Sequence, residues 1–144
     1  MSQIKRFPVE NGTTTFGLHL MLDAYDVPKE KLDDMKLAYK FLNELPEKIG
    51  MKKLTTPLVA DADQSATEFD PGGISGVVLI NESHISIHTF ADKGFFTMDI
   101  YSCSDFSEQQ DDLLEHIRDY YPFKDHELQI VTRGKKYPMH HAKK

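Results

Sequence analysis

Hydrophobic and polar positions alternate along two stretches of the chain, as they do in strands that bury one face. Residues 14–23 place an apolar side chain at every second position from Phe16 to Leu22. Residues 84–89 place His84, Ser86 and His88 on one face and two isoleucines with Thr89 on the other. Both patterns predict half-buried strands.

Further strands are predicted where apolar or β-branched residues gather between turn-forming residues. They cover residues 54–60, 77–80, 95–101 and 128–132. Pro57 cannot donate a backbone hydrogen bond, so we expect the first of these strands to lie at a sheet edge. The acidic, unpatterned residues 61–71 predict a loop, and residues 139–144 predict a frayed tail.

Two other segments show the spacing of amphipathic helices. Pro28 suits a first helical turn, and a helix with a break near Pro46 is predicted to follow it. The apolar face of this helix is predicted to comprise Met35, Ala38, Tyr39, Leu42, Leu45 and Ile49. The second helix follows a capping-box signature, Ser107 with Gln110, and ends at Pro122.

The order strand, helix, strands, helix, strand predicts an α+β fold. We expect a two-layer sandwich, an antiparallel sheet with helices packed on one face, formed by residues 1–144 as a single domain. No linker-like segment divides the chain.

Composition narrows the classes of function. A formal net charge of −6 argues against nucleic acid as a partner and is compatible with a cationic substrate. The one cysteine excludes an intrachain disulfide framework and favours a reducing compartment. Since the N-terminus has no apolar signal region and no apolar run reaches the ~18 residues of a membrane span, we predict a cytoplasmic protein without a membrane partner.

The densest candidate chemistry lies in residues 73–89, GISGVVLINESHISIHT. Glycines precede the apolar strand, and Glu82 and Ser83 fall in the predicted turn between two antiparallel strands. In a strained turn the Ser83 hydroxyl would lie near the carbonyl carbon of Glu82.

The histidines of this stretch could instead suggest a metal site. His84 and His88 share a strand face, yet no third and fourth ligand falls nearby with a recognisable spacing, so no metal is expected. His19, His116 and His126 are scattered over predicted elements, where solvated or hydrogen-bonded roles are the default.

Continued by residues 90–103, FADKGFFTMDIYSC, the stretch resembles the short prokaryotic S-adenosylmethionine decarboxylases, a pyruvoyl-dependent family. The resemblance lies in the glycine turn, the Glu-Ser-His-x-x-x-His core and the spacing of four residues. Ser75 stands eight positions before Ser83, His88 five after it and Cys103 twenty after it.

This resemblance implies self-cleavage between Glu82 and Ser83, giving a beta chain of residues 1–82 and an alpha chain of residues 83–144. Ser83 would become a pyruvoyl group, the cofactor with which a substrate amine forms a Schiff base. Ser75 and His88 would assist processing, with His88 as the base, and Cys103 would be the proton donor in decarboxylation. The short members of the family pair as dimers with the active sites at the interface, which implies a homodimer.

The implied substrate is S-adenosylmethionine, and the implied product is the aminopropyl donor for spermidine biosynthesis. Phe69 matches an aromatic residue that stacks on adenine. Phe90, Ala91 and Asp92 stand where the family usually has Trp-Pro-Glu, with Phe90 able to pack on the base and Asp92 able to bind ribose hydroxyls. These departures leave two alternatives open: a pyruvoyl-dependent arginine or ornithine decarboxylase, or a noncatalytic regulatory relative.

Overall fold

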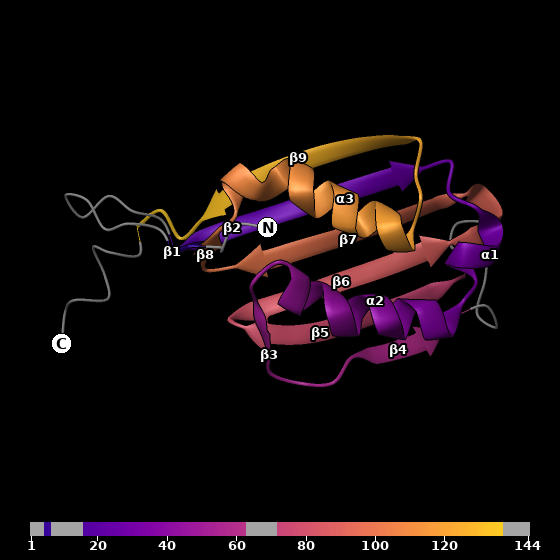
Figure 1. The fold of residues 1–144 in the computed structure, drawn as a ribbon, viewed down its shortest axis with the longest axis horizontal. Coiled ribbons are helices and arrows are strands. Elements are labelled where there is room, and N and C mark those ends of the chain that lie inside the picture. Colours follow the sequence, from indigo (N-terminus) through magenta and orange to yellow (C-terminus); the bar gives the residue numbers. More distant parts are fainter. Residues whose placement is uncertain (1–4, 7–15, 63–71, 137–144) are drawn as a thin grey trace.

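A computed structural model describes residues 5–6, 16–62 and 72–136 of the chain. The framework of the fold is an antiparallel sheet (Figure 1). Its five long strands are β2 (Gly17–Tyr25), β5 (Ile74–Asn81), β6 (Ser83–Phe90), β7 (Phe95–Ser102) and β9 (Asp125–Arg133). Two short strands, β3 (Lys52–Lys53) and β4 (Leu58–Asp61), both pair with β5. Over the described residues the strand order is β3-β5-β6-β7-β2-β9.

Helices cover one face of this sheet (Figure 1). They are α1 (Lys29–Leu32), α2 (Met35–Lys48) and α3 (Gln110–Tyr120). Two short 3-10 turns also occur: η2 (Ala91–Lys93) connects β6 to β7, and η3 (Ser107–Gln109) leads into α3. A separate two-stranded pairing joins β1 (Lys5–Arg6) to β8 (Ser104–Asp105). The α+β sandwich predicted from the sequence is confirmed.

The core lies between the sheet and the helices, and the alternation seen in the sequence decides which side chains enter it. On β2 the leucines at 18, 20 and 22 are buried, and on β6 so are Ile85, Ile87 and Thr89. Their neighbours His19, His84, Ser86 and His88 point to the other face of the sheet. The polar side chains that are candidates for a functional role therefore lie on the face of the sheet opposite the core.

The helix that contains Pro46 differs from the prediction in two ways. It continues through Pro46 to Lys48, with Pro46 itself buried, although the proline cannot donate the hydrogen bond of that turn. Its buried face also includes Phe41, whereas Met35 and Tyr39 are 40% and 43% exposed. The three- and four-residue spacing located the helix but misplaced the edge of its apolar face.

Two smaller predictions also need correction. Of the strand expected at 54–60 only the part after Pro57 forms, as β4, which pairs with β5 alone and so lies at the sheet edge as predicted; β3 precedes the expected range. The capping box does not form: the Gln110 side chain donates to the Ser107 carbonyl oxygen at 2.9 Å, while Ser107 bonds to Asp105. The 3-10 turn η3 occupies the place where the helix was expected to begin.

The described residues contain no helix that is long and apolar enough to cross a membrane. The predicted loop at 61–71 lies mostly outside the described residues, and the predicted tail at 139–144 lies wholly outside them.

Candidate active site

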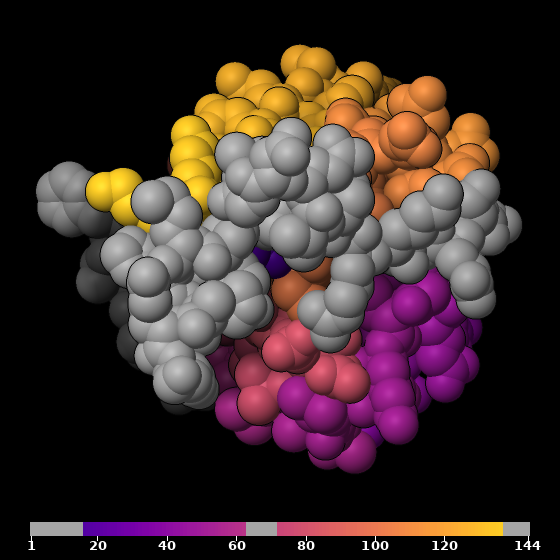
Figure 2. Space-filling view, turned by 90° about the vertical axis from the view of Figure 1, so that its left-hand side faces the viewer, coloured from indigo at the N-terminus to yellow at the C-terminus, as the bar shows by residue number. Residues whose placement is uncertain are grey.

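The Glu82–Ser83 junction lies in the tight turn between β5 and β6, as predicted. Ser83 has a φ of +106°, which a residue with a Cβ rarely adopts. The Glu82 side chain is exposed, and Ser83 is partly buried. Figure 2 faces this end of the sheet, where salmon atoms from the region of the turn lie at the surface. The junction is thus held in an unusual backbone conformation at an accessible edge.

Cys103 lies directly beside this junction. Ser83 pairs with Ser102 across β6 and β7, so the next residue along the chain, Cys103, reaches the turn. Its side chain is buried, and Sγ donates a hydrogen bond to the Glu82 carboxylate at 3.0 Å. The fold therefore brings together three residues that sequence analysis selected: Glu82, Ser83 and Cys103.

Ser75 and His88 form a second cluster. They face each other across β5 and β6, and the Ser75 Oγ lies 2.9 Å from Nδ1 of His88. Both residues line a hollow of about 130 Å³ together with Gly72, Gly73 and Phe90. The serine and histidine side chains are thus paired as a hydroxyl and a potential base.

The two clusters are not brought together within one chain. His88 lies five residues beyond Ser83 on the same strand, which corresponds to about 16 Å at the usual rise of a strand. Ser75 stands opposite His88 and is equally far from the turn. A hydrogen bond from either residue to Ser83 of the same chain is therefore excluded by this geometry.

The expected substrate-binding residues lie at the His88 end of β6. The Phe90 ring stacks on Phe95 with centroids 5.4 Å apart. Asp92 forms an exposed ion pair with Lys29 at 2.8 Å, and the hydrogen bond from that ammonium group lowers the pKa of the Asp92 carboxyl. Phe69, the third expected residue, lies outside the described residues.

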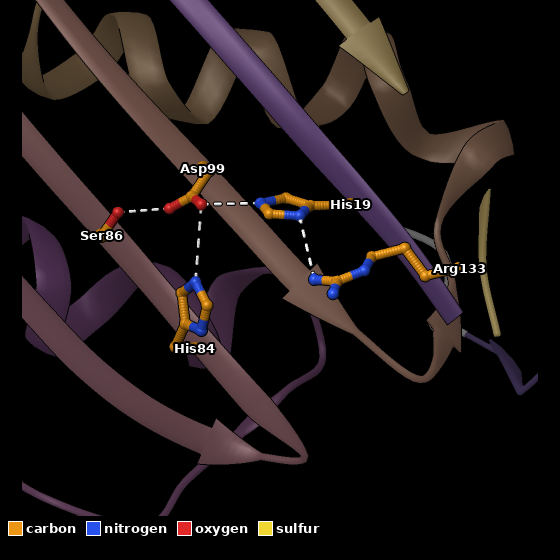
Figure 3. Close-up of polar contacts among 5 residues, drawn as sticks. All are labelled: His19, His84, Ser86, Asp99 and Arg133. Atoms are coloured by element: carbon orange, nitrogen blue, oxygen red, sulfur yellow. Dashed lines mark hydrogen bonds and ion pairs between the residues drawn. The ribbon is translucent and has the colours of Figure 1, made fainter. Parts of the chain in front are cut away.

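Sequence analysis missed a polar cluster on the open face of the sheet (Figure 3). The Asp99 carboxylate on β7 lies 2.6 Å from Nε2 of His19 and 3.5 Å from Nε2 of His84, and it accepts a hydrogen bond from Ser86. No third ligand with a recognisable spacing along the chain accompanies His84, but in the fold His19 from β2 and Asp99 from β7 lie close to it. The expectation that no metal binds stays a prediction. Only the alternation of β2, β6 and β7 hinted that these side chains share a face.

Comparison with protein families gives a match over residues 18–134 to a family described as S-adenosylmethionine decarboxylase. An S-adenosylmethionine decarboxylase proenzyme of Synechococcus sp. (strain WH7803) is 31% identical over 117 residues, which cover 81% of this chain and 84% of that protein. A proenzyme of the same name from Symbiobacterium thermophilum is 32% identical over 90 residues.

The match to the Symbiobacterium protein spans 62% of the length of each chain. Among solved structures, the crystal structure of the adenosylmethionine decarboxylase from Aquifex aeolicus resembles this fold with a TM-score of 0.68 and 29% sequence identity. The likeness covers 84% of this chain and 92% of that one.

Proposed function

Because the chain belongs to the S-adenosylmethionine decarboxylase family, we propose that it is a self-processing decarboxylase whose cofactor arises from Ser83. The hydrogen bond from Cys103 to Glu82 carries this proposal, since it joins a thiol to the residue that precedes the proposed cleavage point. The sequence alone related these two residues only through a family spacing. In the fold they are in contact.

Cleavage begins at the Ser83 hydroxyl. Its oxygen adds to the carbonyl carbon of Glu82, the bond to the Ser83 nitrogen breaks, and that nitrogen takes up a proton, which leaves an ester. A base then removes the Cα proton of residue 83, and the carboxylate of residue 82 departs. Water hydrolyses the remaining dehydroalanine and releases ammonia, so that residue 83 becomes a pyruvoyl group.

The site around residue 83 fits such a group. The pyruvoyl carbonyl supplies an electron sink for the pair of electrons left when a substrate loses CO2. A thiol is a proton donor of the kind that this step needs, and Cys103 is the thiol beside the turn, from which a proton can pass to the substrate carbon. Its burial beside the turn limits access of water to that proton. Cys103 is accordingly our proposed donor.

His88 is our proposed base for the elimination, with Ser75 as its hydrogen-bonding partner. Since about 16 Å of strand separates His88 from Ser83, we infer that the pair acts on Ser83 of a second copy of the chain. A two-fold dimer satisfies this requirement, because symmetry then provides two complete sites from the same contacts.

The substrate that we propose is S-adenosylmethionine, giving the aminopropyl donor for spermidine biosynthesis. Phe90 lines the same hollow as Ser75 and His88, where its aromatic ring can pack on the adenine of the substrate. Asp92 carries the carboxylate for ribose hydroxyls, but in this structure it is paired with Lys29. Binding the ribose would therefore require Asp92 to exchange a charged partner for neutral hydroxyls.

Two measurements on purified full-length protein test the proposal. Intact mass should show two chains that divide between Glu82 and Ser83, and labelled CO2 should be released from S-adenosylmethionine. Ser83→Ala should leave one uncut, inactive chain with an unchanged circular dichroism spectrum. The control Ser107→Ala removes an exposed hydroxyl that donates to Asp105, not to a residue of the turn, and should cleave normally.

Parallel assays with labelled arginine and ornithine separate the alternatives. Release of CO2 from a basic amino acid alone would replace the proposed substrate but keep the cofactor. An uncut wild-type chain that is inert towards all three compounds would overturn the enzymatic proposal and favour a noncatalytic regulatory role. Normal cleavage of Ser83→Ala would remove Ser83 as the precursor.

A further inference from the structure

Asp99 connects three neighbouring strands on the open face of the sheet. It lies on β7 and receives side chains from the strands on both sides, His19 from β2 and both His84 and Ser86 from β6 (Figure 3). Its two carboxylate oxygens divide these contacts: Oδ1 accepts from Ser86, and Oδ2 faces both imidazoles. The carboxylate thus links two residues near the start of β6 to β2.

The hydrogen bonds of this cluster pair donors with acceptors throughout. The Arg133 guanidinium lies 3.5 Å from Nδ1 of His19 and can only donate there, which assigns the His19 proton to Nε2, facing Asp99. Burial by itself would raise the pKa of Asp99, but the hydrogen bonds from Ser86 and His19, together with His84, lower it below its ordinary value. Asp99 is therefore a charged acceptor at neutral pH.

The place of these contacts on β6 bears on the proposed cleavage. The strand begins at Ser83, so cleavage after Glu82 would turn its first residues into a chain terminus. Chain termini fray unless other contacts hold them. The first residues of β6 are paired with β5 and β7, and the side-chain contacts to Asp99 add to that pairing. His84 and Ser86 are the second and fourth residues of that terminus, and both are bonded to Asp99.

We propose that Asp99 is a positioning residue that anchors the newly formed terminus of β6 to β7 and thereby orients the reactive group at residue 83. The inference rests on the proposed self-cleavage. Within it, His84 is the residue bonded to Asp99 that lies nearest to residue 83 along the chain. His19 holds the carboxylate from the opposite side, and Arg133 fixes the tautomer of His19. None of these residues needs to touch the substrate.

Asp99→Ala and Asp99→Asn test this inference in full-length protein that has been allowed to cleave. Both variants should cleave, because the uncut chain still holds β6 through the turn. After cleavage, kcat should fall by about ten- to hundredfold in Asp99→Ala, since small displacements of a reacting group have effects of this size, while KM should change little. Asp125→Asn, on β9 and outside the cluster, is the matched control and should retain wild-type kcat.

Two variants of His84 separate a hydrogen-bonding role from a packing role. His84→Gln keeps an N–H donor near the position of Nε2 and should restore most of kcat, whereas His84→Ala should resemble Asp99→Ala. In a double-mutant cycle, His84→Ala should have little further effect on an Asp99→Ala background. Additive losses would show that the two residues act independently and would overturn the proposal.

Hydrogen exchange supplies a readout that a general loss of stability would not reproduce. In cleaved Asp99→Ala the amides of residues 84–87 should exchange several-fold faster than in the cleaved wild type. In the uncut double variant Ser83→Ala with Asp99→Ala, the same amides should remain protected. Equal exchange in the cut and uncut forms would overturn the anchoring role.

The remaining outcomes are also decisive. A folded Asp99→Asn protein that never cleaves would place the cluster in the cleavage step and would contradict the inference. Tight binding of Zn²⁺ to the wild type, lost in His19→Ala, would instead identify the cluster as a metal site. A wild-type chain that neither cleaves nor turns over would overturn the proposed function itself, whatever the Asp99 variants do.

Discussion

At the scale of single residues, the surroundings of Cys103 distinguish it from an ordinary buried cysteine. A buried free cysteine ordinarily acts as a small hydrophobic side chain. Here the thiol is buried and also hydrogen-bonded to Glu82, beside a serine with positive φ. The hydrogen bond to Glu82 and the position beside Ser83 distinguish Cys103 from a residue that only packs.

Cys103→Ala should still cleave between Glu82 and Ser83 but should release CO2 poorly or divert protonation to the cofactor, because it lacks the proposed donor. We expect kcat to fall by on the order of a hundredfold, the size usual for loss of a general acid. Intact mass and labelled CO2 release measure the two steps separately. Cys103→Ser, which keeps a polar group of similar size, is the control for packing, and full turnover by Cys103→Ala would exclude the thiol as donor.

The sequence carried unequal information about these residues. Ser75, Ser83, His88 and Cys103 could be selected because their family spacing is fixed along the chain. The cluster around Asp99 could not be selected in the same way, since His19 lies 80 residues from Asp99 and meets it only through the pairing of β2 with β7. Side-chain alternation assigns a residue to a face, but strand order decides which residues meet there.

At the scale of elements, Thr89 joins α1, β5 and β6. Its side chain is buried, and its hydroxyl donates to the Leu32 carbonyl at 2.7 Å while accepting from the Ile74 amide at 3.0 Å. Gly73 packs against the Thr89 backbone so closely that an added Cβ would lie 1.8 Å from its carbonyl oxygen. This junction fixes the end of β6 that carries His88 and Phe90.

Thr89→Val should lower the free energy of unfolding by about 2–4 kcal/mol, because it leaves a buried amide and a buried carbonyl without their partner. Denaturant-induced unfolding of the uncut Ser83→Ala protein measures this loss without interference from cleavage. Thr89→Ser keeps the hydroxyl and should cost only about 1 kcal/mol for the lost methyl group. Equal losses in both variants would show that packing, not hydrogen bonding, holds the junction.

The helices and strands were largely predictable from the sequence. Apolar residues recur at every second position in the strands and at every third or fourth position in the helices. The errors arose where local signals competed with the tertiary structure. Asp105 holds Ser107 in the 3-10 turn, so the capping box predicted from Ser107 and Gln110 does not form. Likewise Pro46 is tolerated within the last turn of α2, where Leu45 and Pro46 are both buried.

At the scale of the whole molecule, the sheet separates two groups of functional candidates. Glu82, Ser83 and Cys103 lie at one end of β6, and Ser75 with His88 lies near the other. A symmetric dimer could place the Ser83 end of β6 in one chain beside the His88 end of β6 in the other. Each dimer would then contain two complete sites. The proposed function thus makes a prediction about mixtures of chains.

Ser83→Ala and His88→Ala should each be inactive alone, whereas their co-expression should restore activity. Half of the mixed dimers' sites would combine an intact Ser83 with an intact His88, so random pairing should give about a quarter of wild-type activity. Labelled CO2 release from the co-purified mixture, with separately purified variants as controls, measures the recovery. A mixture no more active than either variant would contradict a site shared between chains.

The length of β6 also has a consequence for the timing of maturation. In the proposed dimer, a newly made chain carries a serine to be cleaved but holds its own base out of reach, so it cannot mature alone. Cleavage then requires an encounter, and at low concentration its rate rises with the square of the number of chains. A strand of eight residues thereby couples the appearance of active enzyme to the abundance of its precursor.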